Sequence, residues 1–253
     1  MENIKQYDLT QFKDDLKELH IDLNQEQMDQ FIQYYELLIE WNSLMNLTAV
    51  TDFHEVLKKH FIDSLSLIKA YDLKNKCNGL NLIDVGTGAG FPGIPLKIAF
   101  PGLKVTLLDS LKKRINFLNH VIAELELKNI KVIHGRAEDY AKPDKLREKF
   151  DLCVSRAVAN LSTLSEYCLP YVKKNGKFIC YKSEKLADEL LYADKAIVVL
   201  GGRMEEKIDY KLPFSDIYRN LLVIEKVKNT PLQYPRKAGL PSKEPIHCIK
   251  KLK

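Results

Sequence analysis

The stretch LIDVGTGAGFPGIPL, residues 82–96, constrains the fold of this chain more than any other feature. It places an apolar tripeptide and an acid, Asp84, directly before glycines at positions 86, 88, 90 and 93, with a second apolar run among and after them. Glycine has no Cβ atom, so a turn rich in glycine lets a ligand approach the backbone closely. A strand, a glycine loop and a helix in this order are typical of the ligand-binding turn of a doubly wound α/β sheet.

Short β-rich segments alternate with helical ones through the middle of the chain, the clearest helix being expected at 111–126. Strands that alternate with helices form right-handed βαβ units, so the pattern predicts a mostly parallel sheet. After residue 183 we expect one more helix and two strands, which suits an antiparallel finish at the sheet's edge. The seven strands are expected at 80–85, 103–109, 130–134, 150–155, 177–182, 196–200 and 217–227.

Helices are expected to precede the sheet, at 8–20 and 25–41, because apolar residues recur there at three- and four-residue spacing. Asp52 is a candidate N-cap for a third helix that reaches to about Tyr71. Asn46 could cap the end of the second helix, but an interior structural role is favoured.

The charge of the chain is asymmetric, although its net value is only +5. Residues 1–60 carry five Lys/Arg against twelve Asp/Glu, a balance of −7, and residues 226–253 carry eight against one, a balance of +7. A basic end with four prolines is either a solubilising tail or an arm for a polyanion.

Cysteine usage and hydropathy indicate the compartment. Five cysteines (77, 153, 168, 180 and 248) include no C-x-x-C pair, which argues against a disulfide framework or a metal site and for a reducing cytosol. No apolar run approaches the roughly 18 residues that a membrane span needs, and the acidic N-terminus lacks the apolar segment of a signal peptide. We therefore expect a cytoplasmic protein with no membrane contact, and nothing demands more than a monomer.

The glycine loop fits neither of the common phosphate-binding patterns. No Gly-Lys-Ser/Thr follows it, and Phe91 stands where the third glycine of the dinucleotide fingerprint would be. Asp109 ends the next strand 23 residues after Gly86 (109 − 86), close to the roughly 20 expected for an acid that binds ribose hydroxyls. A carboxylate before the loop would repel a pyrophosphate but suits the ammonium and sulfonium of S-adenosylmethionine. Asp84 could reach that ammonium, order the loop, or simply cap it.

Several longer motifs stand out besides the glycine loop: WNSLMNLTAV (41–50), KHFIDSL (59–65), DVGTGAGFPGIPL (84–96), LLDSLKKRINFL (107–118), GRAEDY (135–140) and SRAVANL (155–161). In these motifs, and over close to its full length, the chain resembles the small-subunit ribosomal RNA guanine-N7 methyltransferases, the RsmG or glucose-inhibited division protein B family. The ending YPRKAGLPSKEPI resembles the longer C-termini of some members.

The resemblance implies a class I, Rossmann-like methyltransferase core over 73–228, a small helical extension over 1–72 and a basic tail over 229–253. It implies methyl transfer from S-adenosylmethionine to N7 of one guanosine in 16S ribosomal RNA, with that RNA or the small ribosomal subunit as partner. It also assigns residues to the cofactor: Gly86, Gly88 and Phe91 in the loop, Asp109 and Ser110 on the ribose side, Ala137 and Glu138 on the adenine side, and Arg156 closing the site.

The residues narrow the target atom independently. Methyltransferases of exocyclic amines commonly carry an Asn/Asp-Pro-Pro-Tyr/Phe loop after the fourth strand, and DLCVSRAVAN has none. Carbon methylation of a pyrimidine needs a thiolate nucleophile, but Cys153 falls in a strand and Cys168 on a helix, where core thiols are expected. N7 of guanine has a free lone pair and no proton to lose, so placement suffices and no general base is expected.

Seven basic residues are candidates for RNA contact, each with a solvated surface charge as the alternative interpretation. No RRM, KH or OB module is visible. The rival functions are an NAD-dependent oxidoreductase, a non-catalytic ribosome-binding protein with the same fold, and a small-molecule methyltransferase. The RNA candidates are Lys112, Lys113, Arg114, Arg136, Lys182, Arg236 and Lys237.

Overall fold

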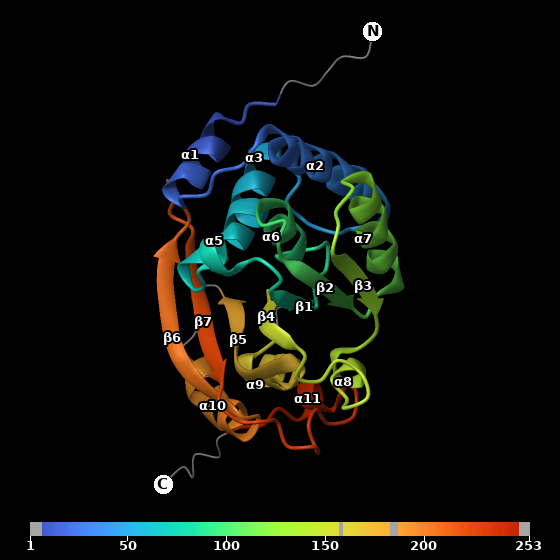
Figure 1. The fold of residues 1–253 in the computed structure, drawn as a ribbon, viewed down its shortest axis with the longest axis vertical. Coiled ribbons are helices and arrows are strands. Elements are labelled where there is room, and N and C mark those ends of the chain that lie inside the picture. Colours follow the sequence, from blue (N-terminus) through green and yellow to red (C-terminus); the bar gives the residue numbers. More distant parts are fainter. Residues whose placement is uncertain (1–6, 157–158, 183–186, 248–253) are drawn as a thin grey trace.

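The computed structural model describes residues 7–156, 159–182 and 187–247. Within them a seven-stranded sheet forms the middle of three layers, with helices on both faces (Figure 1). The strand order is β3-β2-β1-β4-β5-β7-β6, and β7 runs antiparallel to both of its neighbours. The strands are β1 (Asn81–Val85), β2 (Lys104–Asp109), β3 (Ile130–His134), β4 (Phe150–Ser155), β5 (Val172–Lys182), β6 (Gly202–Lys211) and β7 (Tyr218–Lys226).

The central strands are buried on both faces, as parallel strands covered by two helical layers must be. In β1, only the first residue is not fully buried. The register pairs Leu82 with Val105 and Val85 with Leu108, so β1 and β2 end at the same edge of the sheet. This alignment brings the glycine loop after β1 next to Asp109 at the end of β2. The predicted mostly parallel sheet with an antiparallel edge is confirmed.

One predicted strand is wrong. Residues 196–200 belong to the end of α10 (Ala187–Val199) and the turn after it, and the edge strand is instead β6. Ala193, Ala196, Ile197 and Leu200 are buried at the three- and four-residue spacing of a helix. A run of five apolar residues is compatible with a strand or a buried helix, whereas β6 is polar on its exposed face and has a weak strand signal.

Side-chain caps begin two of the N-terminal helices, α2 and α3. Asn24 and Gln27 bond reciprocally at the start of α2, and the Asp52 side chain accepts from the Glu55 N–H, which confirms Asp52 as an N-cap. The interior role expected for Asn46 is wrong: it is exposed and ends α2 in the left-handed conformation, with φ 48°. These elements are α1 (Thr10–Glu18), α2 (Gln25–Met45), α3 (Phe53–Val56), η1 (Leu57–Ile62), α4 (Asp63–Leu65) and η2 (Ser66–Lys69).

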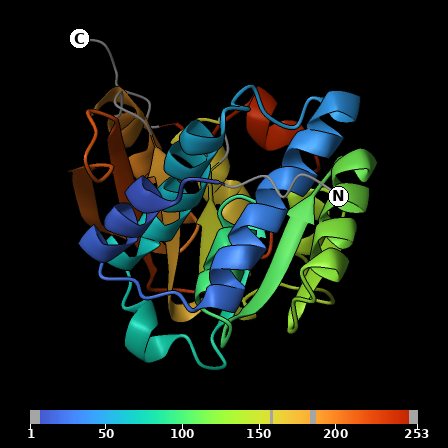
Figure 2. The ribbon, with the colours of Figure 1, turned by 90° about the horizontal axis from the view of Figure 1, so that it is seen from above.

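Helices α2, α6 and α7 lie on one side of the sheet and α8 to α11 on the other (Figure 1). Figure 2 shows α2 and α7 lying alongside each other, and Gln30 of α2 donates to the Leu125 carbonyl at the end of α7. No helix of the described residues has the length and apolar character to cross a membrane. The remaining helices are α5 (Leu73–Lys76), α6 (Gly93–Ala99), α7 (Lys112–Glu124), α8 (Ala137–Tyr140), α9 (Leu161–Cys168), η3 (Leu169–Tyr171) and α11 (Leu240–Lys243).

Packing joins the helical extension to the sheet. Phe31, Tyr34 and Phe61 belong to one buried hydrophobic cluster with Leu82 of β1 and Leu107 of β2. The Tyr34 hydroxyl donates to the Ala89 carbonyl in the glycine loop at 2.5 Å. The predicted boundaries at 72 and 228 stay a prediction, but the core is continuous across the first of them.

Candidate active site

A pocket of about 320 Å³ lies at the carboxyl ends of β1, β2 and β3. This size is within the range of small-molecule sites, and the edge is where doubly wound sheets bind ligands. The lining residues follow the three strands in turn and are completed from α9 and the segment before it. They are Val85 and Gly86 at the end of β1, Leu108 to Leu111 and Arg114 at and after the end of β2, Gly135 to Glu138 after β3, and Ala159, Leu164 and Tyr167.

Asp84 holds the glycine loop in place through hydrogen bonds from its two ends. The side chain is fully buried, and its Oδ2 accepts from the Thr87 hydroxyl at 2.6 Å and from the Gly93 N–H at 2.9 Å. A Cβ at Gly93 would lie 3.0 Å from that oxygen and 2.3 Å from Leu107, so only glycine fits there. Burial raises the pKa of Asp84 to about 6, against the lowering effect of these bonds. Asp84 is not among the pocket-lining residues, and the geometry favours its role in ordering the loop.

Asp109 ties the loop to the second strand and faces the pocket. Its Oδ2 accepts from the Gly88 N–H at 3.0 Å and from Arg114 at 3.2 Å, and its Oδ1 accepts from the Leu111 N–H at 2.9 Å. A carboxylate has about four lone-pair positions, so these three bonds leave one for a ligand hydroxyl. Gly86, with φ 72°, lines the pocket beside it without a side chain.

Glu138 forms part of the opposite wall and is only 4% exposed. Its Oε1 accepts from the N–H of Gly239, which belongs to the C-terminal tail. The tail is therefore packed against the pocket wall, a contact between residues 101 apart that no sequence signal indicates.

Gly88, Phe91 and Arg156 are not among the residues that line this pocket, and their assignment to the cofactor stays a prediction. The Phe91 ring stacks on His60 with centroids 4.7 Å apart, and the Arg156 guanidinium carbon is 5.0 Å from the Phe91 centroid. Arg156 also pairs with buried Asp63 at 3.1 Å, whose other oxygen accepts from Arg219 at 3.1 Å. Phe91 and Arg156 are thus held between the sheet and the helical layer. The aromatic contact with His60 holds Phe91, and the ion pair with buried Asp63 holds Arg156.

Comparison with known proteins decides the family. A family model described as "GidB: rRNA small subunit methyltransferase G" matches residues 27–212, which span the loop and the whole pocket. The chain belongs to this family.

Known relatives agree along nearly the whole length. Ribosomal RNA small subunit methyltransferase G of Lachnoclostridium phytofermentans is 58% identical over 239 residues, covering 94% of this chain and 98% of the relative. The protein of that name from Alkaliphilus oremlandii is 55% identical, covering 93% and 99%. A solved structure of an MtNAS mutant in complex with S-adenosylmethionine is similar in fold, with a TM-score of 0.52 at 19% identity over 87% of this chain and 78% of that one. The predicted family and fold are confirmed, and the oxidoreductase alternative is set aside.

Four of the seven predicted RNA contacts are exposed in this member of the family. Lys112 and Lys113 open α7, Arg136 lies at the mouth of the pocket, and Lys237 lies on the tail. Their contact with RNA stays a prediction.

The other three basic residues are engaged with carboxylates. Arg114 pairs with buried Asp109 and Lys182 with Glu189 at 2.9 Å, while Arg236 binds fully buried Glu166 through both its Nε and Nη2. Each guanidinium or ammonium would have to leave a protein partner to meet a phosphate. Only the pairing of Arg236 with Glu166 joins residues distant in the chain, 70 apart, whereas Asp109 and Glu189 lie within seven residues of their partners.

The thiols of Cys153 and Cys168 and the imidazole of His60 are not placed for acid–base or nucleophilic chemistry. Cys153 and Cys168 are fully buried, which confirms them as core thiols, and burial raises the pKa of Cys168 well above its usual value. Burial first, and then the charge of Arg156, lower the pKa of His60 to about 3, so its imidazole is neutral. Tyr167 is a pocket residue that the sequence analysis missed, since a lone tyrosine on a helix gives no signal.

Proposed function

We propose that this chain transfers a methyl group from S-adenosylmethionine to N7 of one guanosine in the 16S RNA of the small ribosomal subunit. The observation that supports this most is the pocket at the ends of β1 to β3 in a member of the methyltransferase G family, with two buried carboxylates, Asp109 and Glu138, in its walls. The chain acts in the cytoplasm as a monomer.

The pocket suits a nucleoside with positive charge better than a dinucleotide. Asp109 has a lone pair free for a ribose hydroxyl, and Gly86 lets the ligand approach the backbone. Leu108 and Leu164 supply apolar surface for an adenine ring, next to Ala137 and Glu138. A pyrophosphate would be repelled by the two buried carboxylates, whereas a sulfonium or an ammonium would not be. When bound, S-adenosylmethionine supplies an electrophilic methyl group.

The chain's own contribution is placement. N7 attacks through a lone pair that carries no proton, so no side chain has to accept one during the transfer. His60 is neutral and the thiol of Cys168 is protonated, which agrees with a reaction that uses neither. The loop, held by Asp84 and Asp109, fixes one face of the pocket before the cofactor arrives.

The experiment is nucleoside mass spectrometry of small-subunit RNA incubated with the protein and S-adenosylmethionine carrying a labelled methyl group. We expect one equivalent of labelled 7-methylguanosine per RNA, and none with a boiled sample. Free 16S RNA and assembled subunits are tested side by side as substrates. A label on another atom or base, or no label on either substrate, would contradict the proposal.

A further inference from the structure

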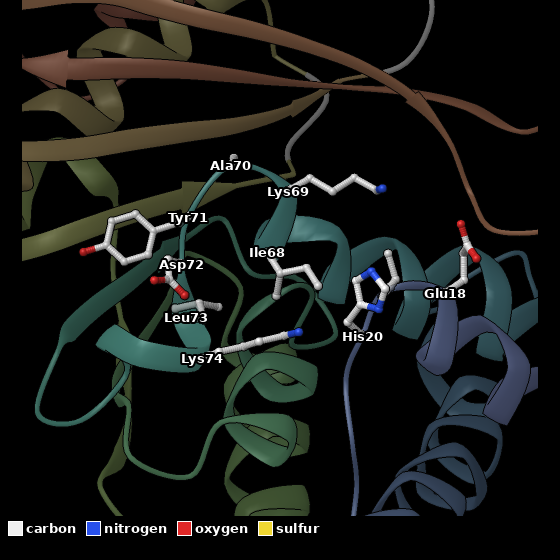
Figure 3. Close-up of a pocket in the computed structure, with 10 residues that line it drawn as sticks. Glu18, His20, Ile68, Lys69, Ala70, Tyr71, Asp72, Leu73 and Lys74 are labelled. Carbon is white, nitrogen blue, oxygen red and sulfur yellow. The ribbon is translucent and has the colours of Figure 1, made fainter.

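Three adjoining grooves lie at the edge of the sheet opposite the pocket, where the parallel strands begin. The first, about 620 Å³, separates the end of α1 from residues 68–74. The second, about 470 Å³, shares residues 70–72 with the first and reaches the starts of β4 and β5. The third, about 420 Å³, crosses the starts of β1 to β4. Figure 3 shows the first groove, with Lys74 directed toward His20.

Lysine dominates the walls of these grooves. Nine lysines line them against three carboxylates, those of Glu18, Asp72 and Asp151, a balance of +6 (9 − 3) that exceeds the +5 of the entire chain. We call this surface the lysine edge. Its lysines are Lys69, Lys74, Lys76, Lys104, Lys131, Lys149, Lys173, Lys174 and Lys177.

Most of these charges have no acidic partner. Lys173 pairs with Asp151 at 2.9 Å and Lys177 with Glu205 at 2.8 Å, and the other seven take part in no ion pair within the described part of the chain. On the catalytic side Arg114, Lys182 and Arg236 are engaged with carboxylates, and four other predicted RNA contacts take part in no ion pair of the described residues: Lys112, Lys113, Arg136 and Lys237. The seven unpaired lysines of the lysine edge outnumber these four.

The kind of partner follows from what else lines the grooves. Apolar residues such as Ile68, Val105 and Ile130 also line the grooves, but none of the large apolar side chains that are exposed in the described residues lies in them, so no exposed apolar patch marks this surface for an apolar protein partner. The remaining lining includes hydrogen-bonding groups such as Asn81, Thr106 and Asn129. Unpaired lysines with polar neighbours in a hollowed surface match the phosphates of a nucleic-acid backbone.

We propose that the lysine edge binds the phosphate backbone of the substrate RNA, as a second contact surface remote from the reacting guanine. The proposal rests on the proposed function, since it takes ribosomal RNA as the ligand. From β3 to β5 the edge spans four strand intervals, about 19 Å, which accommodates several phosphates. An RNA that reaches both edges has to pass around the protein, so a folded RNA binds more tightly than a short oligonucleotide that contains only the target guanosine.

The test compares two triple variants. Lys104→Gln, Lys131→Gln and Lys149→Gln neutralise the third groove, whose lysines take part in no ion pair of the described residues. The control is Lys13→Gln, Lys195→Gln and Lys207→Gln, three exposed lysines on α1, α10 and β6, of which Lys207 pairs with exposed Asp209 at 3.0 Å. Affinity for 16S RNA is measured between 50 and 200 mM salt, together with affinity for S-adenosylmethionine.

The salt slope is the steepness with which the logarithm of RNA affinity falls against the logarithm of salt concentration, and the loss of three phosphate contacts lowers it by about 2. The rise from 50 to 200 mM salt therefore weakens RNA binding by the wild type about 20-fold more than RNA binding by the groove variant. The control keeps the wild-type slope. Both variants keep the wild-type affinity for S-adenosylmethionine and for the short oligonucleotide. A second variant, Lys69→Gln with Lys74→Gln and Lys174→Gln, shows the same decrease if the grooves act as one surface.

Equal salt slopes for the groove variants and the control would overturn the proposal. So would groove variants that bind folded RNA with the wild-type affinity but bind anionic lipid vesicles more weakly than the wild type does. The two proposals can fail separately. If a groove variant binds and methylates RNA like the wild type, the proposal for the lysine edge is wrong and the proposed methyltransferase activity is unaffected. If the wild type binds RNA through the lysine edge but forms no 7-methylguanosine, the proposed activity is wrong and the lysine edge still binds RNA.

Discussion

At the scale of single residues, three buried carboxylates organise the site through backbone N–H groups. Asp84 accepts from Gly93, Asp109 from Gly88, and Glu138 from Gly239. In each case the donor is a glycine: a Cβ at Gly93 would lie only 3.0 Å from the Asp84 oxygen, and Gly88 and Gly239 have φ 62° and 85°, where other residues are strained. Asp84 does not line the pocket, whereas Asp109 and Glu138 do, so similar bonds serve different purposes.

Gly86→Val is expected to lower the affinity for S-adenosylmethionine at least tenfold, about 1.4 kcal/mol. Gly86 lines the pocket at φ 72°, where a β-branched residue is strained and its side chain would occupy ligand space. Isothermal titration calorimetry measures the affinity. Gly79→Val is the control, because Gly79 has φ 77° and open space around it away from the pocket. Tight NADH binding by the wild type without any S-adenosylmethionine binding would sink the cofactor assignment.

The pH dependence of stability contains a contribution from Asp84. Its pKa is raised from 3.8 to about 6 in the folded state, mainly by burial, so between these values the folded protein binds more protons than the unfolded one. The free energy of unfolding should therefore fall as pH rises from about 4 to 6. Asp84→Asn should remove this part of the slope, measured by urea unfolding across that range. An identical slope in the variant would show that Asp84 is ionised with its ordinary pKa.

The rate of methyl transfer should be nearly flat between about pH 6 and 8.5 in single turnovers at saturating substrates. The reason is that N7 has no proton to lose and that the imidazole of His60 and the thiol of Cys168 do not titrate in this range. Cys153→Ser and Cys168→Ser should keep the rate, with some loss of stability. A tenfold rise per pH unit, or a folded cysteine variant without transfer, would rule out simple attack by N7.

At the scale of elements, the C-terminal tail packs across α8 and α9, and we call this packed segment the strap. Arg147 donates to the carbonyls of Thr230 and Tyr234, and Arg236 clamps Glu166 on α9. Farther along, Gly239 donates to Glu138 and Thr163 donates to the Pro241 carbonyl. The tail lies outside the part of the chain that matches the family model. Its basic residues thus serve partly to hold it on the enzyme.

Arg236→Ala should lower the free energy of unfolding by about 3 kcal/mol, because it leaves the buried Glu166 carboxylate without its partner. The affinity for S-adenosylmethionine should fall severalfold, since a detached strap no longer holds Glu138 in the pocket wall. Thermal melts and calorimetry measure the two effects. Lys237→Ala, which removes an exposed neighbour of the same charge, should change neither. Equal effects of the two variants would mean that only the net charge of the tail matters.

At the scale of the whole molecule, the helical extension and the sheet share one core. Phe31 and Phe61 pack in the same cluster as Leu82 and Leu107, and Asp63 binds Arg156 and Arg219 from the sheet side. We expect a single calorimetric transition whose enthalpy equals the van't Hoff value. Two resolved transitions would instead support an independent domain that ends near residue 72.

The sequence by itself determined six of the seven strands, the loop and the ligand class that fits it. These depend on neighbours in the chain: hydrophobic periodicity over a few residues, glycines in a turn, and acids at strand ends. The predicted strands 80–85 and 103–109 match β1 and β2 within a residue, and Gly86, Asp109, Ser110, Ala137 and Glu138 do line one pocket. The error at 196–200 marks the limit of such local patterns, because a short apolar run buries itself equally well as helix or strand.

Only the tertiary structure decided which charges are free. Arg236 and Glu166 are 70 residues apart in the chain, and Arg156 and Asp63 are 93 apart, so their pairing leaves no trace in local composition. The positions of Phe91 and Gly239 also depend on residues that are distant in the chain. Phe91 packs on the rings of Tyr34 and His60, outside the pocket lining, and the Gly239 N–H donates to Glu138. A buried carboxylate must find a partner to offset its desolvation, and the partner that it takes is set by the fold.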